Sequence, residues 1–237
     1  MDLTKFDQKH VRATDIWGET FIGFASHCNQ AFLTHEYGGD EDGVIIGNFL
    51  LYNSQIAAME EIEVHGTAEL RTERLTLRRY TPEDAETLFQ SFGTDPEASR
   101  YSGWNPYATP EKAKETVRRF IKSYDDERFY GWAMDVDGVL MGTIGAYDYA
   151  DDQIEVGFSV KRSWQGRGYA AAALQKVLEY LTENEGIATV TAWCAAENEA
   201  SRKVLEKAGM RHIRTEKDGL TVGEKTYDKL IYTYQNV

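Results

Sequence analysis

The segment that most constrains the fold is an apolar strand that leads through glycines into a long helix. Residues 153–160 read QIEVGFSV, which is typical of a buried strand, and residues 165–170 read QGRGYA. A helix is predicted over 168–183, because apolar residues recur there at the spacing of one helix face: Leu174, Val177, Leu178 and Leu181. Glycines at such a junction leave backbone N–H groups uncovered at the positive end of a helix dipole, so the segment predicts an anion site.

A diphosphate fits the predicted anion site. Arg167 lies within the glycine segment and can add a charge-assisted contact. The alternative interpretation of this segment, taken alone, is an ordinary strand-to-helix turn with two convenient glycines.

Strands and helices alternate through residues 67–237, which predicts a separate α/β domain there. The predicted strands cover 74–79, 130–136, 140–149, 153–160, 189–194, 210–217 and 225–234. The predicted helices cover 82–92, 110–125, 168–183 and 199–208. Thr81 and Thr109 each precede a proline and an acid, which marks the starts of the first two helices.

Residues 1–66 have a different pattern, which predicts a small all-β barrel as a second domain. A short helix is expected over 3–8. The predicted strands cover 10–16, 19–26, 30–35, 44–52 and 55–64. The sequences VRATDIWGETFIGFASHCNQAFL and IIGNFLLY resemble the two strand signatures of an Sm-like (SH3-like) barrel.

The C-terminal domain resembles the GNAT superfamily of N-acetyltransferases through three segments in the same order. RTERLTLRRYTPEDAETLF is similar to that superfamily's first strand and helix. QGRGYA at 165–170 matches its Q-x-x-G-x-A loop, and NEAS followed by VLEKAGM resembles its N-x-x-S…E-K-x-G-F segment. The branch that the sequence resembles most contains the ribosomal-protein alanine and serine N-acetyltransferases.

This resemblance implies a mixed central sheet that is splayed between its fourth and fifth strands, 153–160 and 189–194. It also implies acetyl-CoA as the co-substrate, with its pantetheine arm in the gap between these strands. The residues implied to bind acetyl-CoA are Phe158, Val160, Gln165, Gly166, Arg167, Gly168, Tyr169, Ala170, Asn198 and Ser201. For Asn198 the alternative role is to cap the helix that follows it.

Acetyl transfer to an amine needs a group that accepts the amine proton, and Glu155 is the candidate base. The resemblance places a glutamate at this position of the strand, and backbone N–H groups of the same strand can stabilise the oxyanion. The alternative role for Glu155 is that of an exposed strand residue. Other carboxylates considered for the base are Asp148, Asp151 and Asp152.

The general acid is left open by the sequence. Many superfamily members carry a tyrosine in the helix after the asparagine, whereas this chain has Glu206 in that region. The thiolate can leave without such an acid, or a hydroxyl elsewhere can assist, from Tyr147, Tyr149 or Ser159.

An aromatic segment between the first two helices is the expected acceptor wall. Its candidate substrate-binding residues are Tyr101, Trp104 and Tyr107, for which ordinary packing over the core is the alternative. The expected acceptor is a primary amine, and the branch suggests a protein N-terminus. Small-molecule amines such as an antibiotic or a polyamine, and a non-catalytic acyl-CoA-binding regulator, are the alternatives.

Composition narrows the classes of partner. A net charge of −13 disfavours binding to nucleic acid, and residues 1–68, with 3 basic and 11 acidic side chains, share this bias. Because nucleic-acid binding is disfavoured, the expected role of residues 1–66 is docking to a partner, formation of a homodimer or presentation of substrate.

No apolar run is long enough for a membrane helix, and no signal sequence is evident, so a soluble cytoplasmic protein is expected. Cys28 and Cys194 are expected to be buried thiols, and no metal site is expected.

Overall fold

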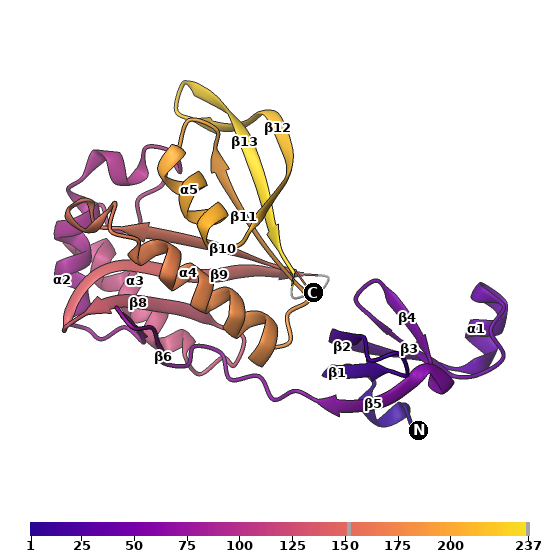
Figure 1. The fold of residues 1–237 in the computed structure, drawn as a ribbon. Coiled ribbons are helices and arrows are strands. Elements are labelled where there is room, and N and C mark those ends of the chain that lie inside the picture. Colours follow the sequence, from indigo (N-terminus) through magenta and orange to yellow (C-terminus); the bar gives the residue numbers. More distant parts are fainter. Residues whose placement is uncertain (151–152, 236–237) are drawn as a thin grey trace.

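The chain forms two β-sheets joined by an extended segment (Figure 1). The computed structural model describes residues 1–150 and 153–235. The first sheet is antiparallel with the order β4-β3-β2-β1-β5. Its strands are β1 (Lys9–Asp15), β2 (Thr20–Cys28), β3 (Gly43–Ile46), β4 (Phe49–Tyr52) and β5 (Ile56–Glu61). Single 3₁₀ turns cover Thr4–Phe6 and Asn53–Gln55.

Two predictions for the first sheet are wrong. Residues 30–35 are not a strand but belong to helix α1 (Gln30–Tyr37), because Asn29 caps its start by accepting from the Phe32 N–H at 2.9 Å. The apolar run 44–52 is two strands, since Gly47 adopts a φ of 57° and turns the chain between β3 and β4. Both errors come from a local signal beside or within an apolar run, the helix cap at Asn29 and the turn at Gly47.

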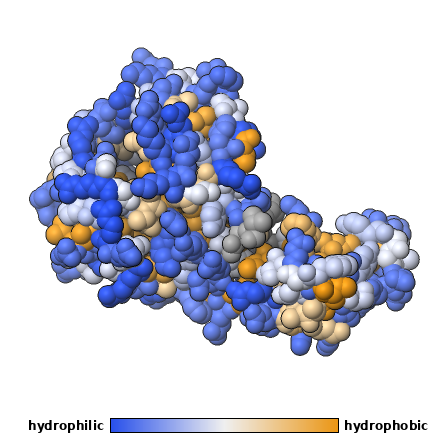
Figure 2. All heavy atoms as spheres, in the orientation of Figure 1, coloured by the Kyte–Doolittle hydropathy of each residue, from blue (hydrophilic) through white to orange (hydrophobic). Residues whose placement is uncertain are grey.

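This sheet has its own core and also a partly apolar surface. The core is formed by Leu3, Phe6, Val11, Ala13, Phe21, Ala25, Val44, Ile46, Leu51 and Ile56. Apolar side chains gather on its outer surface (Figure 2), where Ile16, Trp17 and Phe49 are exposed. The outer strands in hydrogen-bonding order are β4 and β5. The Sm-like barrel stays a prediction.

The second sheet is mixed, as expected, with the order β12-β13-β11-β10-β9-β8-β7-β6. Its strands are β6 (Leu70–Arg71), β7 (Thr76–Arg78), β8 (Tyr130–Val136), β9 (Val139–Ala150), β10 (Gln153–Val160), β11 (Thr189–Ala195), β12 (Arg211–Val222) and β13 (Lys225–Tyr234). Neighbouring strands are antiparallel except β10 and β11, which are parallel. All seven residues of β8 are buried, because helices cover both faces of the sheet.

The two faces carry different helices. Helices α4 (Tyr169–Glu179) and α5 (Glu199–Lys207) pack on the face that holds Trp132 and Ile154. The opposite face, with Ala133 and Leu140, is covered by α2 (Asp84–Leu88) and α3 (Pro110–Ser123). Wider π turns extend α2 over Phe89–Gly93 and α4 over Tyr180–Asn184. The 3₁₀ turns of this part are Pro96–Ser99 and Arg162–Trp164.

One of the two predicted helix caps is confirmed. The Thr109 hydroxyl accepts from the Lys112 N–H at 3.2 Å and caps α3. At α2 the Thr81 hydroxyl does not cap the helix. Instead the Asp84 carboxylate accepts from the Thr81 N–H at 2.8 Å and also pairs with Arg78. The helix therefore begins later than the sequence predicts.

A buried glutamate fixes the segment between the sheets. Glu185 is 0% exposed and accepts from the backbone N–H groups of His65 (2.9 Å) and Gly66 (3.1 Å). The hydroxyls of Tyr130 (2.8 Å) and Tyr180 (2.6 Å) donate to it as well. Burial and the adjacent carboxylate raise the pKa of both phenols well above the ordinary value, so they remain donors.

Replacing this acceptor should destabilise the protein. We expect Glu185→Ala to lower the free energy of unfolding by at least about 3 kcal/mol, because each buried donor left unpaired costs ~1–3 kcal/mol. Urea denaturation followed by circular dichroism measures the change. Glu183→Ala, an exposed neighbour, is the matched control and should change stability by less than about 0.5 kcal/mol. Equal losses in the two variants would contradict the role of Glu185.

Candidate active site

The parallel strands β10 and β11 separate after a short stretch of pairing. They pair over Gln153–Thr189, Ile154–Val190 and Glu155–Thr191, and then diverge as β10 continues to Val160 and β11 to Ala195 (Figure 1). Phe158 and Val160 lie half-buried on the separated part of β10. Strand backbone groups that have lost their neighbour need other partners, so the fork can bind an extended ligand through the main chain.

The glycine segment begins where β10 ends. The Gln165 side-chain amide donates to the Val160 carbonyl at 2.9 Å and holds the segment against the strand. Gly166 (φ 75°) and Gly168 (φ 84°) adopt left-handed conformations, and Gly168 is the N-cap of α4. Within the described part of the chain, the N–H groups of Gly166, Arg167 and Gly168 have no backbone acceptor. They lie with Tyr169 and Ala170 at the positive end of α4, as an anion site requires.

Two cations from distant segments line the same loop. Arg74 donates from Nη1 to the Arg167 carbonyl at 2.8 Å, and its guanidinium lies 4.4 Å from the Tyr169 ring centroid. A Cβ on Gly168 would lie 3.3 Å from Arg74 Nη1 and 3.7 Å from Lys207 Nζ. Sequence reasoning missed both residues, although Arg74 and Lys207 fall inside motif segments, because nothing local shows that they converge on residue 168.

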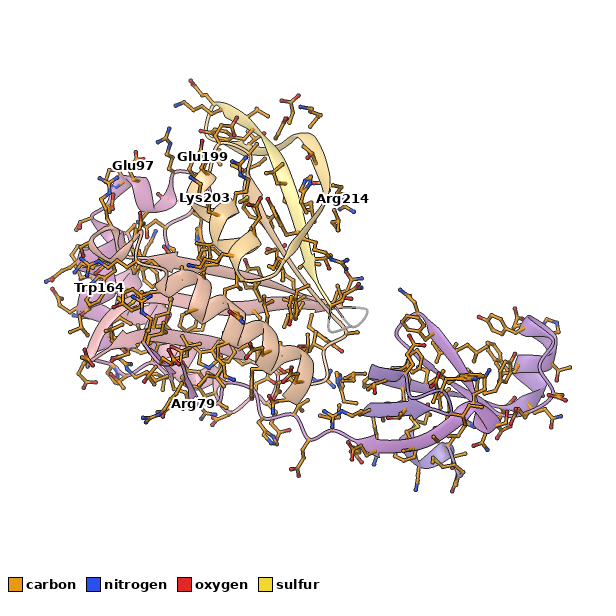
Figure 3. All side chains as sticks on the ribbon, in the orientation of Figure 1. Arg79, Glu97, Trp164, Glu199, Lys203 and Arg214 are labelled. Atoms are coloured by element: carbon orange, nitrogen blue, oxygen red, sulfur yellow. The ribbon has the colours of Figure 1, made fainter. Side chains whose placement is uncertain are left out.

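Aromatic packing stiffens the loop. Trp164, labelled in Figure 3, meets Tyr169 edge-on with ring centroids 5.7 Å apart. The Arg167 guanidinium lies 5.4 Å from the Trp164 ring centroid. Such contacts limit the conformations of the loop before any ligand arrives.

Asn198 has the capping role that the sequence left as an alternative. Its side-chain oxygen accepts from the Ser201 N–H at 3.1 Å at the start of α5. Contacts of Asn198 and Ser201 with acetyl-CoA stay predictions.

Glu155 lies at the last paired position of the fork and is half-buried. Its Oε1 accepts from the Trp193 indole N–H at 2.8 Å. Tyr147 lies at the opposite position on β9, which places its phenol beside this carboxylate. Burial, together with this carboxylate, raises the pKa of Tyr147 well above its ordinary value, so the phenol is neutral at physiological pH.

The other carboxylate candidates lie nearby in the sequence. Asp148 follows Tyr147 with a φ of 57°. Asp151 and Asp152 lie outside the described residues.

Glu206, which stands in the region of the expected tyrosine, is exposed and accepts from the buried Tyr232 hydroxyl at 3.3 Å. Burial raises the pKa of Tyr232 to about 12.

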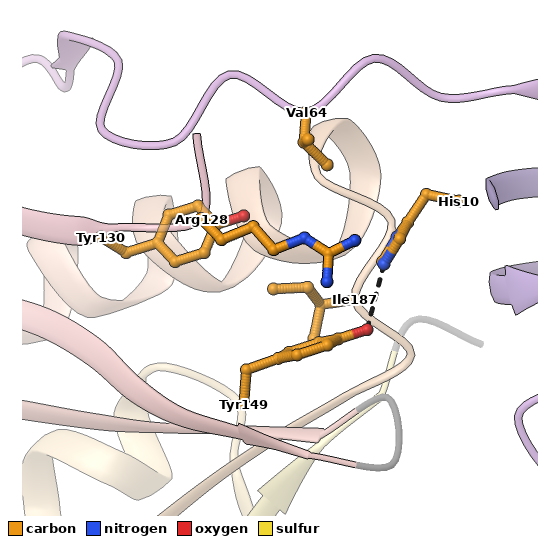
Figure 4. Close-up of a pocket in the computed structure, with 6 residues that line it drawn as sticks. All are labelled: His10, Val64, Arg128, Tyr130, Tyr149 and Ile187. Atoms are coloured by element: carbon orange, nitrogen blue, oxygen red, sulfur yellow. Dashed lines mark hydrogen bonds between the residues drawn. The ribbon is translucent and has the colours of Figure 1, made fainter. Parts of the chain in front are cut away.

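The remaining acid candidates have different surroundings. Tyr149 is hydrogen-bonded to His10 of the first sheet at 3.0 Å, beside a cavity of about 10 Å³ (Figure 4). Ser159 pairs with Thr143 on β9. The cavity has room for about one water molecule and therefore no room for a substrate.

The aromatic segment crosses the open side of the fork. The Tyr101 hydroxyl donates to the Glu197 carbonyl at 3.4 Å, and its ring meets that of Tyr227 on β13 at 5.5 Å. Trp104 is 65% exposed. Asp95, at the start of the segment, lies 3.8 Å from Arg162 after β10. The segment thus touches structure on both sides of the separated strands.

Tyr107 lies inside the protein. It is 7% exposed and packs against Phe92 with ring centroids 5.9 Å apart. Burial raises its pKa to about 12. Packing, the alternative considered from the sequence, accounts for this ring.

Within residues 1–150 and 153–235, no group of three or more histidine, cysteine, aspartate or glutamate side chains is arranged to hold a metal ion. Cys28 and Cys194 are buried free thiols, and burial raises the pKa of Cys194 to about 11. Among the described helices, none is long and apolar enough to cross a membrane.

Comparison with known proteins identifies one family. The family model of the acetyltransferase (GNAT) domain matches residues 74–211. The N-acetyltransferase YoaA of Bacillus subtilis is 29% identical over 69% of this chain and 94% of its own length. The N-acetyltransferase p20 of Bacillus licheniformis is 31% identical over 70% of this chain and 92% of its own length.

Solved structures share the fold of the second sheet and its helices. One is RimL, described as a ribosomal L7/L12 α-N-protein acetyltransferase in complex with coenzyme A. It superposes with a TM-score of 0.65 at 16% identity and covers 71% of this chain and 98% of its own.

A charge placed in the glycine segment should block acetyl-CoA. We expect Gly168→Asp to weaken acetyl-CoA binding by at least about 100-fold, because the carboxylate would oppose the diphosphate and pair with Arg74 and Lys207. Isothermal titration calorimetry measures the affinity.

Gly138→Asp is the matched control for this change. Gly138 has a similar φ of 82° but lies in the β8–β9 turn, where a Cβ would meet no other atom within 4 Å. It carries the same backbone strain and should bind acetyl-CoA like the wild type. Unchanged binding by Gly168→Asp would contradict a diphosphate site at this loop.

Proposed function

The chain belongs to the acetyltransferase (GNAT) family, and from this premise we propose that it acetylates the α-amino group of a protein N-terminus. As a member of this family it is an acetyl-CoA-dependent N-acetyltransferase. The observation that carries the proposal is the fork between β10 and β11, with Glu155 at its base and the glycine segment at its far end. Glu155 lies on β10 and the glycine segment follows the end of that strand, so the two can serve the two ends of one cofactor arm.

The loop residues suit the phosphate end of acetyl-CoA. The N–H groups of residues 166–168 have no backbone acceptor among the described residues, which favours an anion site there. Arg74, Arg167 and Lys207 add positive charge around this site. The separated edge of β10, with Phe158 and Val160, is the surface for the pantetheine arm. In this arrangement the thioester reaches the base of the fork, where Glu155 lies.

The reaction joins the amine nitrogen to the acetyl carbonyl carbon and breaks the bond from that carbon to sulfur. Glu155 accepts the proton that the amine loses, directly or through water. Backbone N–H groups of β10 stabilise the oxyanion as it forms. The thiolate of coenzyme A leaves and takes up a proton, which completes the balance of atoms and charge.

The surroundings of the fork favour a polypeptide as acceptor. Trp104 is largely exposed on the aromatic segment beside the fork, so it can contact a chain that extends out of the site. The net charge of −13 favours basic proteins as partners. RimL, which shares the fold, is described as acting on an α-amino group of a ribosomal protein.

An acceptor panel tests this proposal. Purified protein is mixed with acetyl-CoA and with N-terminal peptides beginning with alanine or serine, the same peptides with blocked N-termini, polyamines and aminoglycosides. Release of free thiol with the unblocked peptides is the expected result. Release only with small amines would replace the peptide by a small-molecule acceptor, and acetyl-CoA binding without release from any amine would favour a non-catalytic regulator.

Loss of the base should reduce turnover but not binding. We expect Glu155→Gln to lower kcat by about 100-fold or more, because general bases contribute on this scale, while the Kd for acetyl-CoA stays within about twofold. Thiol-release assays give kcat, and isothermal titration calorimetry gives the Kd for acetyl-CoA. Glu115→Gln, on the exposed face of α3, is the control and should leave both unchanged. Wild-type turnover in Glu155→Gln would remove Glu155 from its role.

Trp104 should contribute to acceptor binding alone. We expect Trp104→Ala to raise the KM for the peptide by about tenfold, since an exposed aromatic anchor is worth about 1 kcal/mol or more, with the KM for acetyl-CoA unchanged. Trp17→Ala is the matched control, because Trp17 is 71% exposed but lies in the first sheet. If both variants keep the wild-type peptide KM, the aromatic segment is not the acceptor wall.

A further inference from the structure

The carboxylate of Glu155 has an aromatic side chain from each neighbouring strand beside it. Trp193 donates to it from β11, and Tyr147 lies opposite Glu155 on β9. We propose that Trp193 and Tyr147 are positioning residues, which both donate to the Glu155 carboxylate and orient it toward the amine at the fork. The proposal rests on the proposed function, because it assigns these two residues to the base of that reaction.

The Trp193 contact bridges the fork itself. The last paired residue of β11 is Thr191, so Trp193 lies where the backbone bonds between the two strands have stopped. Its indole N–H nevertheless reaches Glu155 Oε1 at 2.8 Å. On β13 the Lys229 ammonium lies 5.0 Å from the centroid of the Trp193 ring and helps to fix the plane of the indole. A side-chain bond therefore sets the spacing of the strands beside the base.

A local irregularity of β9 brings Tyr147 to the same carboxylate. The register between β9 and β10 shifts between Gln153 and Glu155, and Asp148 takes a left-handed φ of 57° at this bulge. A bulge re-aims the neighbouring side chain. A conformation that is uncommon outside glycine persists where the surrounding structure enforces it.

Gly157 provides the space for this arrangement. A Cβ at residue 157 would lie 2.6 Å from the Tyr147 hydroxyl, so a side chain there would displace the phenol. Residues 155 and 157 share one face of β10, which places the phenol beside the Glu155 side chain. Gly157 and the bulge at Asp148 thus act together to place the Tyr147 phenol beside Glu155.

The chemistry of the two donors suits a base and not a proton donor to sulfur. An indole N–H and a phenol O–H can each donate to a carboxylate oxygen and so fix its orientation. In the proposed arrangement the Tyr147 proton is directed to Glu155, so Tyr147 is a poor source of a proton for the leaving thiolate. Charged groups also lie beside the two aromatic side chains: Asp148 adds negative charge near the Tyr147 phenol, and the Lys229 ammonium lies 5.0 Å from the Trp193 ring centroid.

The hydrogen bond can be tested without any activity. In ¹⁵N-labelled protein the five tryptophans give five indole N–H signals, and Trp193→Phe identifies its own. The Trp193 signal should move with pH as the carboxylate protonates, and Glu155→Gln should abolish this movement. A Trp193 signal whose pH dependence is the same in Glu155→Gln would overturn the proposal.

Kinetics then separates a positioning role from a structural one. Removing a donor to the ionised carboxylate favours its protonated form, so the acidic limb of the kcat/KM profile should move to higher pH. We expect a shift of about half to one pH unit in both Trp193→Phe and Tyr147→Phe. The KM for acetyl-CoA should stay constant, and Glu115→Gln, on the exposed face of α3, should keep the wild-type profile.

Matched controls remove similar bonds elsewhere. Trp132→Phe deletes an indole N–H bond to the Ala68 carbonyl, and Tyr124→Phe deletes a phenol bond to the Gly131 carbonyl. Both should lower stability without moving the acidic limb. If Trp193→Phe and Tyr147→Phe behave like these controls while Glu155→Gln is impaired, the positioning role fails and the proposed function stands. If the wild type releases no thiol with any amine, the proposed function fails instead, and the indole titration still decides whether Trp193 holds the carboxylate.

Discussion

β10 and β11 share backbone hydrogen bonds only as far as Glu155 and Thr191, and the features of the site follow from this early separation. A parallel pair that continued to Val160 would satisfy its own main chain and leave nothing for a ligand. Because the strands diverge, one edge of β10 is open between a carboxylate at its base and a glycine segment at its end. The glycine segment before α4 and the proposed base Glu155 are thus connected by strand backbone, as the proposed binding of one extended substrate requires.

Side chains rather than backbone hold the fork in shape. Gln165 ties the glycine segment to the end of β10, and Trp193 ties β11 back to Glu155. Tyr101 and Asp95 connect the aromatic segment to Glu197, which follows β11, and to Arg162, which follows β10. The first sheet is fixed at the opposite end, where Glu185 binds the connecting segment and Arg12 donates to the Glu183 carbonyl at 2.8 Å.

The sequence predicted what local pattern and motif control, and missed what the tertiary fold brings together. The mixed sheet was implied by the resemblance to the GNAT superfamily, and the helix after the glycines follows from periodicity and from the QGRGYA segment. Helix α1 was missed because its Asn29 cap and Gly38 end are weak signals beside an apolar run. Arg74, in the turn between β6 and β7, and Lys207 on α5 meet at Gly168 only because β6 and α5 both pack against α4, so no spacing rule could pair them. The bond from Trp193 to Glu155 depends on the divergence of the strands, which the residues themselves do not reveal.

The most direct measurement is hydrogen exchange of the backbone amides with and without acetyl-CoA. If the fork binds the cofactor through its main chain, acetyl-CoA should slow exchange over residues 156–160 and 166–170. The already paired residues 189–191 and the first sheet should exchange as before. Slower exchange confined to other segments, with 156–160 and 166–170 unaffected at saturating acetyl-CoA, would contradict binding in the opened strand edge.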